Sequence, residues 1–187
     1  MTKDTGVAIH SDALLGKRVL LAIAGGIAAV ESVRLARELR RHQADLTVIM
    51  SEEATKIITP LAVSWGSDTI VHQGWSSEMS QLDAFDLILI APATRNTISK
   101  HLHGIMDSPL LMALSASRGR KSKLCFVPSM HTDLFDDPVT SELLDALRDE
   151  GSHVIINEVD EGKLKQPDPI SIVAEVCHIA NLSLIHI

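Results

Sequence analysis

Two adjacent glycines, Gly25 and Gly26, follow a nearly unbroken apolar run at residues 18–24. Such a run is typical of a strand buried on both faces. In residues 27–42 apolar and charged side chains separate at helical spacing, so the glycines mark a sharp strand-to-helix turn. The first turn of a helix has backbone N–H groups without partners and partial positive charge. This stretch is therefore either an anion site, where glycine lets a phosphate approach the backbone, or a plain strand-to-helix connection.

Small and polar side chains also follow three later apolar segments. Ser51 follows the segment 45–50, the segment 92–96 follows 86–91, and the segment 128–131 follows 123–127. Because the carboxyl ends of parallel strands meet at one edge of a sheet, these groups are expected to converge on a single site.

Strands and helices alternate along the chain. Strands are predicted at 18–24, 45–50, 69–71, 86–91, 123–127 and 153–156. Helices are predicted at 27–42, from residue 52 until Pro60 stops the helix, from the segment after Pro92 to residue 103, and at 108–117, 141–150 and 170–180. This alternation predicts an α/β fold, a three-layer Rossmann-like parallel sheet with helices on both faces.

The bulk composition favours one domain. The chain has 187 residues, of which 45% are apolar, and we place a tail at 1–16 and a single domain at 17–181. A net charge of −7 without a basic cluster argues against a nucleic-acid partner, and no apolar run reaches the length of a membrane span or a signal peptide. The two cysteines lack zinc-site spacing, so we expect no disulfide framework, no metal site and a cytoplasmic location.

The last six residues, 182–187, read LSLIHI. One back-translation of this segment resembles the end of a common transposon sequencing adapter. We therefore expect 182–187 to be a non-native tail.

Familiar ligand motifs do not match the first turn. Residues 24–29 read AGGIAA, which lacks the spacing of a dinucleotide-binding Gly-x-Gly-x-x-Gly. Gly16 and Lys17 precede the strand, so they do not form a P-loop, and the chain has no Gly-x-Ser-x-Gly nucleophile elbow. The ligand classes still open for this turn are a mononucleotide and other phosphorylated compounds.

Five segments together carry a family resemblance. They are AGGIAA at 24–29, MSEEATKIITPL at 50–61, APATRNT at 91–97, GIMDSPL at 104–110 and PSMHTDLFDDP at 128–138. In this order they resemble the homo-oligomeric flavin-containing cysteine decarboxylases, a family that includes phosphopantothenoylcysteine decarboxylase. The resemblance implies a flavodoxin-type Rossmann-like fold, FMN, and trimers or dodecamers. It also implies flavin-dependent oxidative decarboxylation of a small thiol-bearing or peptide cysteine carboxylate.

The resemblance also implies roles for particular residues. The FMN contacts carried over are Gly25, Gly26, Ile27, Ser51, Ala93, Thr94, Asn96, Met106 and Asp107. The substrate contacts are Asn96, Met130 and His131. Ser108 stands where the family usually has asparagine, so the resemblance does not carry over that polar contact.

Two departures concern the reaction. Glu78 stands where the decarboxylases have histidine, and it is either a base whose pKa is raised by burial or a solvated carboxylate. His72, six residues earlier, could fill the same space. His131 replaces the asparagine that binds the substrate carboxylate, and a protonated or neutral imidazole could still bind it. The family's clamp cysteine is absent from the segment EVDEGKLKQPDP.

Three functions stay open. The first is a decarboxylase in which Glu78 and His131 have altered catalytic roles. The second is an FMN-dependent reductase or electron-transfer flavoprotein similar to dihydromethanopterin reductase, and the third is a non-catalytic regulatory paralogue.

Overall fold

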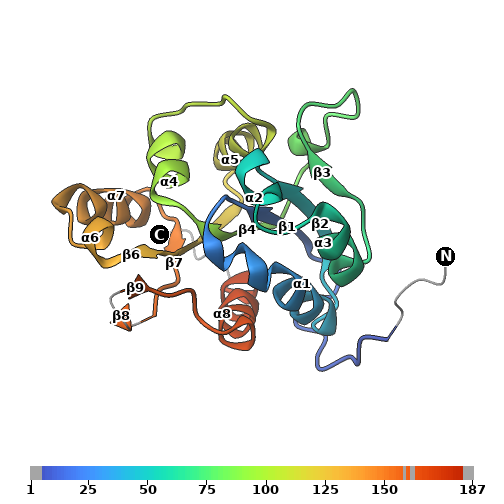
Figure 1. The fold of residues 1–187 in the computed structure, drawn as a ribbon. Helices are drawn as coiled ribbons and strands as arrows, with labels where there is room; N and C mark the ends of the chain where they lie inside the picture. Colours follow the sequence, from blue (N-terminus) through green and yellow to red (C-terminus); the bar gives the residue numbers. More distant parts are fainter. Residues whose placement is uncertain (1–5, 158, 161–162, 183–187) are drawn as a thin grey trace.

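The computed structural model describes residues 6–157, 159–160 and 163–182. Within these residues six strands form one parallel sheet in the order β3-β2-β1-β4-β5-β7 (Figure 1). The strands are β1 (Arg18–Ile23), β2 (Asp45–Met50), β3 (Val71–Gln73), β4 (Leu87–Ala93), β5 (Lys123–Pro128) and β7 (His153–Val154). The order reverses between β1 and β4, and in doubly wound sheets ligands bind outside the carboxyl ends of the strands at this point.

Helices cover both faces of the sheet, which confirms the three-layer Rossmann-like architecture predicted from the sequence (Figure 1). One face carries α1 (Ser32–Arg41), α2 (Glu52–Thr55), α3 (Pro60–Ser67) and α8 (Pro169–Asn181). The other carries α4 (Arg95–Leu102), α5 (Pro109–Gly119) and α7 (Pro138–Asp149). No helix in the described part of the chain is long and apolar enough to cross a bilayer.

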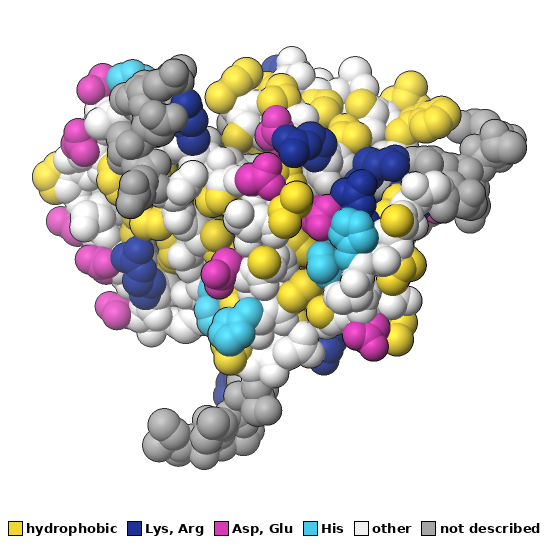
Figure 2. All heavy atoms as spheres, turned by 90° about the horizontal axis from the view of Figure 1, so that it is seen from below, with side chains coloured by type: hydrophobic (Ala, Val, Ile, Leu, Met, Phe, Trp, Pro, Cys, Tyr) yellow, Lys and Arg dark blue, Asp and Glu magenta, His cyan; other side chains and the backbone are white. Residues whose placement is uncertain are grey.

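The N-terminal segment packs against the end of α1. The amide of His10 donates to the Arg41 carbonyl at 2.8 Å, and the amide of Leu14 donates to the His42 carbonyl at 2.9 Å. Leu14 is fully buried in the core, so part of the segment before residue 17 contributes to the fold. The underside of Figure 1, where α1 and α8 lie, carries several histidine side chains (Figure 2).

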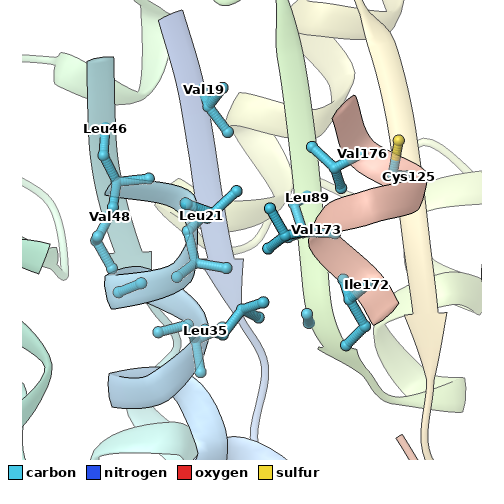
Figure 3. Packing of buried hydrophobic residues seen from close by; sticks show 14 of the residues in the cluster. Val19, Leu21, Leu35, Leu46, Val48, Leu89, Cys125, Ile172, Val173 and Val176 are labelled. Carbon is cyan, nitrogen blue, oxygen red and sulfur yellow. The ribbon is translucent and has the colours of Figure 1, made fainter. Parts of the chain in front are cut away.

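Alternate residues of the strands fill two cores. Leu21 of β1 and Val48 of β2 pack under Leu35 of α1, whereas Val173 of α8 packs over Leu89 of β4 (Figure 3). The neighbouring residues of each strand point to the opposite face and meet α4, α5 and α7. Because β1 and β4 are buried on both sides, their sequences are apolar, apart from the exposed Arg18 that begins β1.

Polar residues that follow strands or loops begin most of the helices. The side chains of Ser51, Thr59, Thr94, Ser108, Asp137 and Asp168 each accept a hydrogen bond from a backbone N–H in the first turn of the next helix. Proline opens four of these helices, α3, α5, α7 and α8, where its missing N–H costs nothing.

Two of the predicted helices differ from the structure. The helix predicted at 27–42 begins with a 3-10 turn, η1 (Ile27–Glu31), and becomes α-helical only at Ser32. Pro60 does not stop a helix begun at residue 52, because α2 ends at Thr55 and Pro60 opens α3.

Short elements surround the carboxyl edge of the sheet. A small antiparallel sheet, in the order β6-β9-β8, joins β6 (Met130–His131), β9 (Lys163–Leu164) and β8 (Val159–Asp160). Two further short helices are η2 (Ser80–Leu82) and α6 (Thr132–Phe135). The β6–β9 pairing brings the segment after β5 beside the segment before α8.

Candidate functional site

A cleft of about 480 Å³ lies at the carboxyl edge of the sheet, between the turn after β1 and the small antiparallel sheet. It is lined by Ile27, Ala28, Glu31, Ser129, Met130, His131, Leu164, Lys165 and Gln166. The structure therefore brings together Ile27, Met130 and His131, three of the residues that sequence analysis selected. Ile27 is 76% exposed at the rim, which is unusual for a large apolar side chain and suits contact with a ligand or a second subunit.

The two glycines that precede the cleft serve different purposes. A β-carbon on Gly25 would lie 2.2 Å from Cβ of Glu53 in α2, so Gly25 permits close packing of the chain itself. A β-carbon on Gly26 would project toward Pro92 and Thr94, with its nearest atom at 3.4 Å. Gly26 therefore keeps open the space between the ends of β1 and β4. Gly26 also caps η1 without a side-chain hydrogen bond, which leaves the first N–H groups of η1 for a ligand.

Hydroxyl groups at the same edge are engaged as helix caps. The Ser51 hydroxyl accepts a hydrogen bond from the Ala54 amide at 3.2 Å. The Thr94 hydroxyl accepts from the Thr97 amide at 3.2 Å and lies 2.9 Å from the Thr97 hydroxyl. Asn96, in the first turn of α4, is exposed. It is therefore the polar side chain of this segment that is best placed to meet a ligand.

Arg95, which opens α4, is tied to the next layer by an ion pair with Asp137, 2.6 Å between Nη1 and Oδ2. Two hydrogen bonds hold the pKa of the Asp137 carboxyl below its usual range, first one from the Val139 amide and then one from Arg95. This pair fixes the start of α4 relative to α7.

Two other predicted cofactor contacts, Ala93 and Asp107, are already engaged within the protein, whereas Met106 is open. Ala93 is fully buried, and its carbonyl accepts a hydrogen bond from the Ser129 amide at 3.3 Å, so its side chain faces the core. The Asp107 carboxylate is paired with Lys100 at 2.5 Å between Oδ2 and Nζ. Met106 is 52% exposed on the loop between α4 and α5, where its side chain is open to a ligand or a second subunit.

His131 has a defined ring orientation at the cleft. The Asp133 amide donates to Nδ1 of His131 at 3.3 Å, so a neutral ring carries its proton on Nε2. The Asp133 carboxylate lies 3.2 Å from the same Nδ1, and in a protonated ring it would accept a hydrogen bond from Nδ1–H. Either form leaves Nε2–H as a donor.

Gln166 is a site residue that sequence analysis missed. Its side-chain amide nitrogen and oxygen are both buried, and neither has a hydrogen-bond partner among the described residues. An unpartnered buried amide costs free energy, which a polar ligand in the adjacent cleft would recover. Sequence analysis examined this segment only for a cysteine, and a polar side chain between Lys165 and Pro167 was its one visible signal.

Glu78 does not line this cleft. It is exposed, and it borders a separate hollow of about 250 Å³ together with His72, Gln73 and Gln81. Glu78 and His72, which sequence analysis related to the same space, thus line one hollow. Within a single chain, however, Glu78 is exposed, whereas its interpretation as a base assumed burial.

Comparison with known proteins bears on this site. A family model described as Flavoprotein matches residues 7–181. The chain belongs to the flavoprotein family. The matched region includes both sides of the cleft and most of the N-terminal segment.

Among curated proteins, this flavoprotein is similar to the coenzyme A biosynthesis bifunctional protein CoaBC. The identity is 39% over 165 residues for the protein of Thermococcus kodakarensis, which is 84% of this chain and 41% of the relative. For the protein of Methanocaldococcus jannaschii it is 33% over 159 residues, 83% of this chain and 39% of the relative. The flavoprotein thus spans about 40% of the length of these relatives.

Solved structures share the fold. MrsD from a Bacillus species matches with a TM-score of 0.80 at 20% identity, over 91% of this chain and 99% of that chain. A variant of PPC decarboxylase complexed with pantothenoylaminoethenethiol matches with a TM-score of 0.73 at 21% identity, over 86% and 96% of the two chains. At these identities the likeness shows the flavoprotein's fold.

Proposed function

We propose that this flavoprotein binds FMN and decarboxylates a thiol-bearing, cysteine-derived carboxylate. The observation that carries the proposal is the cleft in which the uncapped η1 turn faces His131 and the unpartnered amide of Gln166. The similarity to CoaBC, a coenzyme A biosynthesis protein, supports a substrate related to phosphopantothenoylcysteine.

The residues at the sheet edge fit the cofactor. The uncapped N–H groups at the start of η1, from Ile27 onward, and the space between the β1 and β4 ends suit a phosphate and its ester chain. The Ser51 hydroxyl can donate a hydrogen bond to the phosphate while its oxygen still accepts the hydrogen bond that caps α2. Thr94 and Asn96 would border the ribityl chain. When bound, FMN supplies a two-electron acceptor for the thiol-bearing end of the substrate, which makes loss of carbon dioxide feasible.

The substrate carboxylate is assigned to His131 and Gln166. His131 presents Nε2–H, and the Gln166 amide can donate a second hydrogen bond. Asp133 positions the His131 ring through Nδ1. Two oriented donors hold the carboxylate against the cofactor edge, so that the breaking carbon–carbon bond is placed for reaction.

A homo-oligomer is part of this proposal. Large apolar side chains are more than half exposed near the site and on α3, among them Ile27 at 76%, Leu61 at 65% and Trp65 at 55%. Large apolar side chains with this degree of exposure are typical of a subunit interface. Light scattering coupled to size exclusion tests this part, and a monomer at micromolar concentration would contradict it.

Two experiments test the cofactor and the reaction in turn. The absorbance spectrum of the purified protein, followed by release and identification of the chromophore, tests FMN; a colourless protein that takes up no FMN refutes the proposal. Incubation with phosphopantothenoylcysteine and with a cysteine-terminated peptide, each followed by mass spectrometry, tests the loss of carbon dioxide. We expect His131→Ala to lower turnover while His103→Ala, on an exposed histidine after α4, leaves it unchanged.

The exposure of Glu78 favours a second candidate, an FMN-dependent reductase or a regulatory paralogue. Neither of these functions needs a buried base at this position. A protein that binds FMN, leaves both carboxylates intact and passes electrons from a reduced nicotinamide to an acceptor is the reductase. A protein that binds FMN and does neither is the regulatory form.

A further inference from the structure

Three potential metal ligands meet away from the cleft, where the N-terminal segment crosses the end of α1. The Oε1 atom of Glu38 lies 3.4 Å from Nε2 of His42 and 3.8 Å from Nδ1 of His10. These three atoms all lie within 4.8 Å of one another. Figure 2 shows the underside of the molecule, the side of α1, on which histidine side chains gather.

The carboxylate is buried and already oriented. The Glu38 side chain is only 4% exposed, although it is an acidic residue. Its second oxygen, Oε2, accepts a hydrogen bond from Nη1 of Arg41 at 2.7 Å. Arg41 therefore occupies one oxygen and leaves Oε1 for the two imidazoles.

The histidines are held by their surroundings. Nδ1 of His42 lies 2.6 Å from the Ser11 hydroxyl, so the ring is fixed by a partner on the side away from Glu38. Metal-bound histidines commonly have such a partner on the other ring nitrogen. The backbone of His10 is anchored by the hydrogen bond from its amide to the Arg41 carbonyl. The two rings lie edge to face, with centroids 6.2 Å apart.

We propose that His10, Glu38 and His42 form a zinc site that joins the N-terminal segment to α1. Two imidazole nitrogens and one carboxylate oxygen are a known ligand set for tetrahedral Zn²⁺, with water in the fourth position. Ligand atoms around such an ion lie about 3.4 Å apart, given bonds of about 2.1 Å. The distance between Glu38 and His42 already has this value, and a small inward movement of His10, whose side chain is 52% exposed, completes the set.

This site escaped sequence analysis, which judged metal binding from the cysteines alone. Glu38 and His42 are four residues apart and share a helix face, but His10 lies 28 residues before Glu38, in the N-terminal segment. Only the folded chain brings the third ligand to the pair.

The test uses the full chain as purified, without a polyhistidine tag. After treatment with a chelator and its removal, zinc sulfate is titrated by calorimetry, and bound metal is measured by elemental analysis. We expect one Zn²⁺ per chain and a higher unfolding temperature with zinc, because the metal binds the folded form. Absence of stoichiometric zinc, or no change in unfolding temperature, overturns the proposal.

Variants locate the ion. His10→Ala removes an exposed ligand that the fold does not need, so we expect a folded protein with at least about tenfold weaker zinc binding. Ser11→Ala, which removes the partner of His42, is expected to weaken binding by about tenfold. His178→Ala changes an exposed histidine on α8 outside the cluster and serves as the matched control. Equal zinc affinity in His10→Ala and His178→Ala contradicts the site.

Discussion

Replacing Gly25 and Gly26 separately with alanine distinguishes the packing of this turn from its binding function. The perturbation is the same methyl group one residue apart. At Gly25 the new Cβ would lie 2.2 Å from Cβ, 3.1 Å from the carbonyl carbon and 3.2 Å from Cα of Glu53. These atoms belong to the backbone and stem of α2 rather than to the end of a flexible side chain, so α2 must move.

The two substitutions have different expected costs. Forced overpacking of this kind typically costs about 1–3 kcal/mol, so for a chain of this length we expect Gly25→Ala to lower the unfolding temperature by roughly 2–12 °C. At Gly26 the nearest atoms, on Pro92 and Thr94, lie at 3.4–3.6 Å, which is close to ordinary contact. The free energy of unfolding of Gly26→Ala is expected to stay within about 0.5 kcal/mol of the original.

For flavin affinity we expect the opposite order, with the larger effect at Gly26. Gly26→Ala places a methyl group in the space that we assign to the phosphate, and Gly26→Val fills it further, so FMN affinity is expected to fall by at least about tenfold, or about 1.4 kcal/mol. Thermal unfolding of the apoprotein by circular dichroism gives the first quantity, and fluorescence titration with FMN gives the second.

Two results would refute this reasoning. An unchanged unfolding temperature in Gly25→Ala would mean that α2 does not pack on the turn as described. Unchanged FMN affinity in Gly26→Val, with the fold intact, would mean that the phosphate lies elsewhere.

Three further predictions concern single residues. Ser51→Ala removes the cap of α2, so we expect it to lower the free energy of unfolding by about 1 kcal/mol and to weaken FMN binding. Thr59→Ala removes the cap of α3 and is expected to lower the free energy of unfolding by the same amount without changing FMN affinity. Thermal unfolding and titration with FMN measure the two quantities. Burial lowers the pKa of His101 below the usual 6.5, so the folded protein binds this proton less tightly than the unfolded chain. The contribution of neutral His101 to stability is complete above pH 6.5 and is lost as the pH falls below 6.5. Over this pH range the unfolding temperature of His101→Gln should therefore fall less steeply than that of the original protein. Parallel plots of unfolding temperature against pH for the two proteins would contradict this assignment. Burial raises the pKa of the Cys125 thiol to about 12, so Cys125 is expected to react with a thiol reagent only when the protein unfolds, as rapid labelling of the native protein would disprove.

The fold was predictable where local signals decide it. The apolar run in β1 reads as a doubly buried strand because it is one, and Ser51 caps α2 as its residue type suggests. Such features depend on neighbours in the sequence and need no knowledge of distant segments.

Elements governed by tertiary context were less predictable. Pro92 was expected to end its strand, yet β4 continues through it to Ala93. The register with β5 shifts between Ile90 and Ala93, and the Pro92 carbonyl still accepts a hydrogen bond from the Ala24 amide at 3.2 Å. A strand can accommodate proline when an irregularity removes the need for its N–H, and the sequence does not reveal this irregularity.

The site shows the same division. Ile27 and His131 follow strands, so topology alone placed them at one edge. Gln166 follows no strand of the main sheet and reaches the cleft only through the β6–β9 pairing, in which Met130 lies opposite Leu164. Its part in the site could not be predicted without that pairing.

The small antiparallel sheet has a consequence for how flavoproteins of this kind diversify. The strand β9 pairs with β8 on one side and with β6 on the other, and among the described residues neither β8 nor β9 pairs with the six-stranded sheet, so the segment that carries them is bound to the rest mainly along one edge. Changes of length or composition there leave the two cores and the turn after β1 untouched. Branches of the family could therefore exchange this segment, and with it their choice of substrate, while inheriting the cofactor half unaltered.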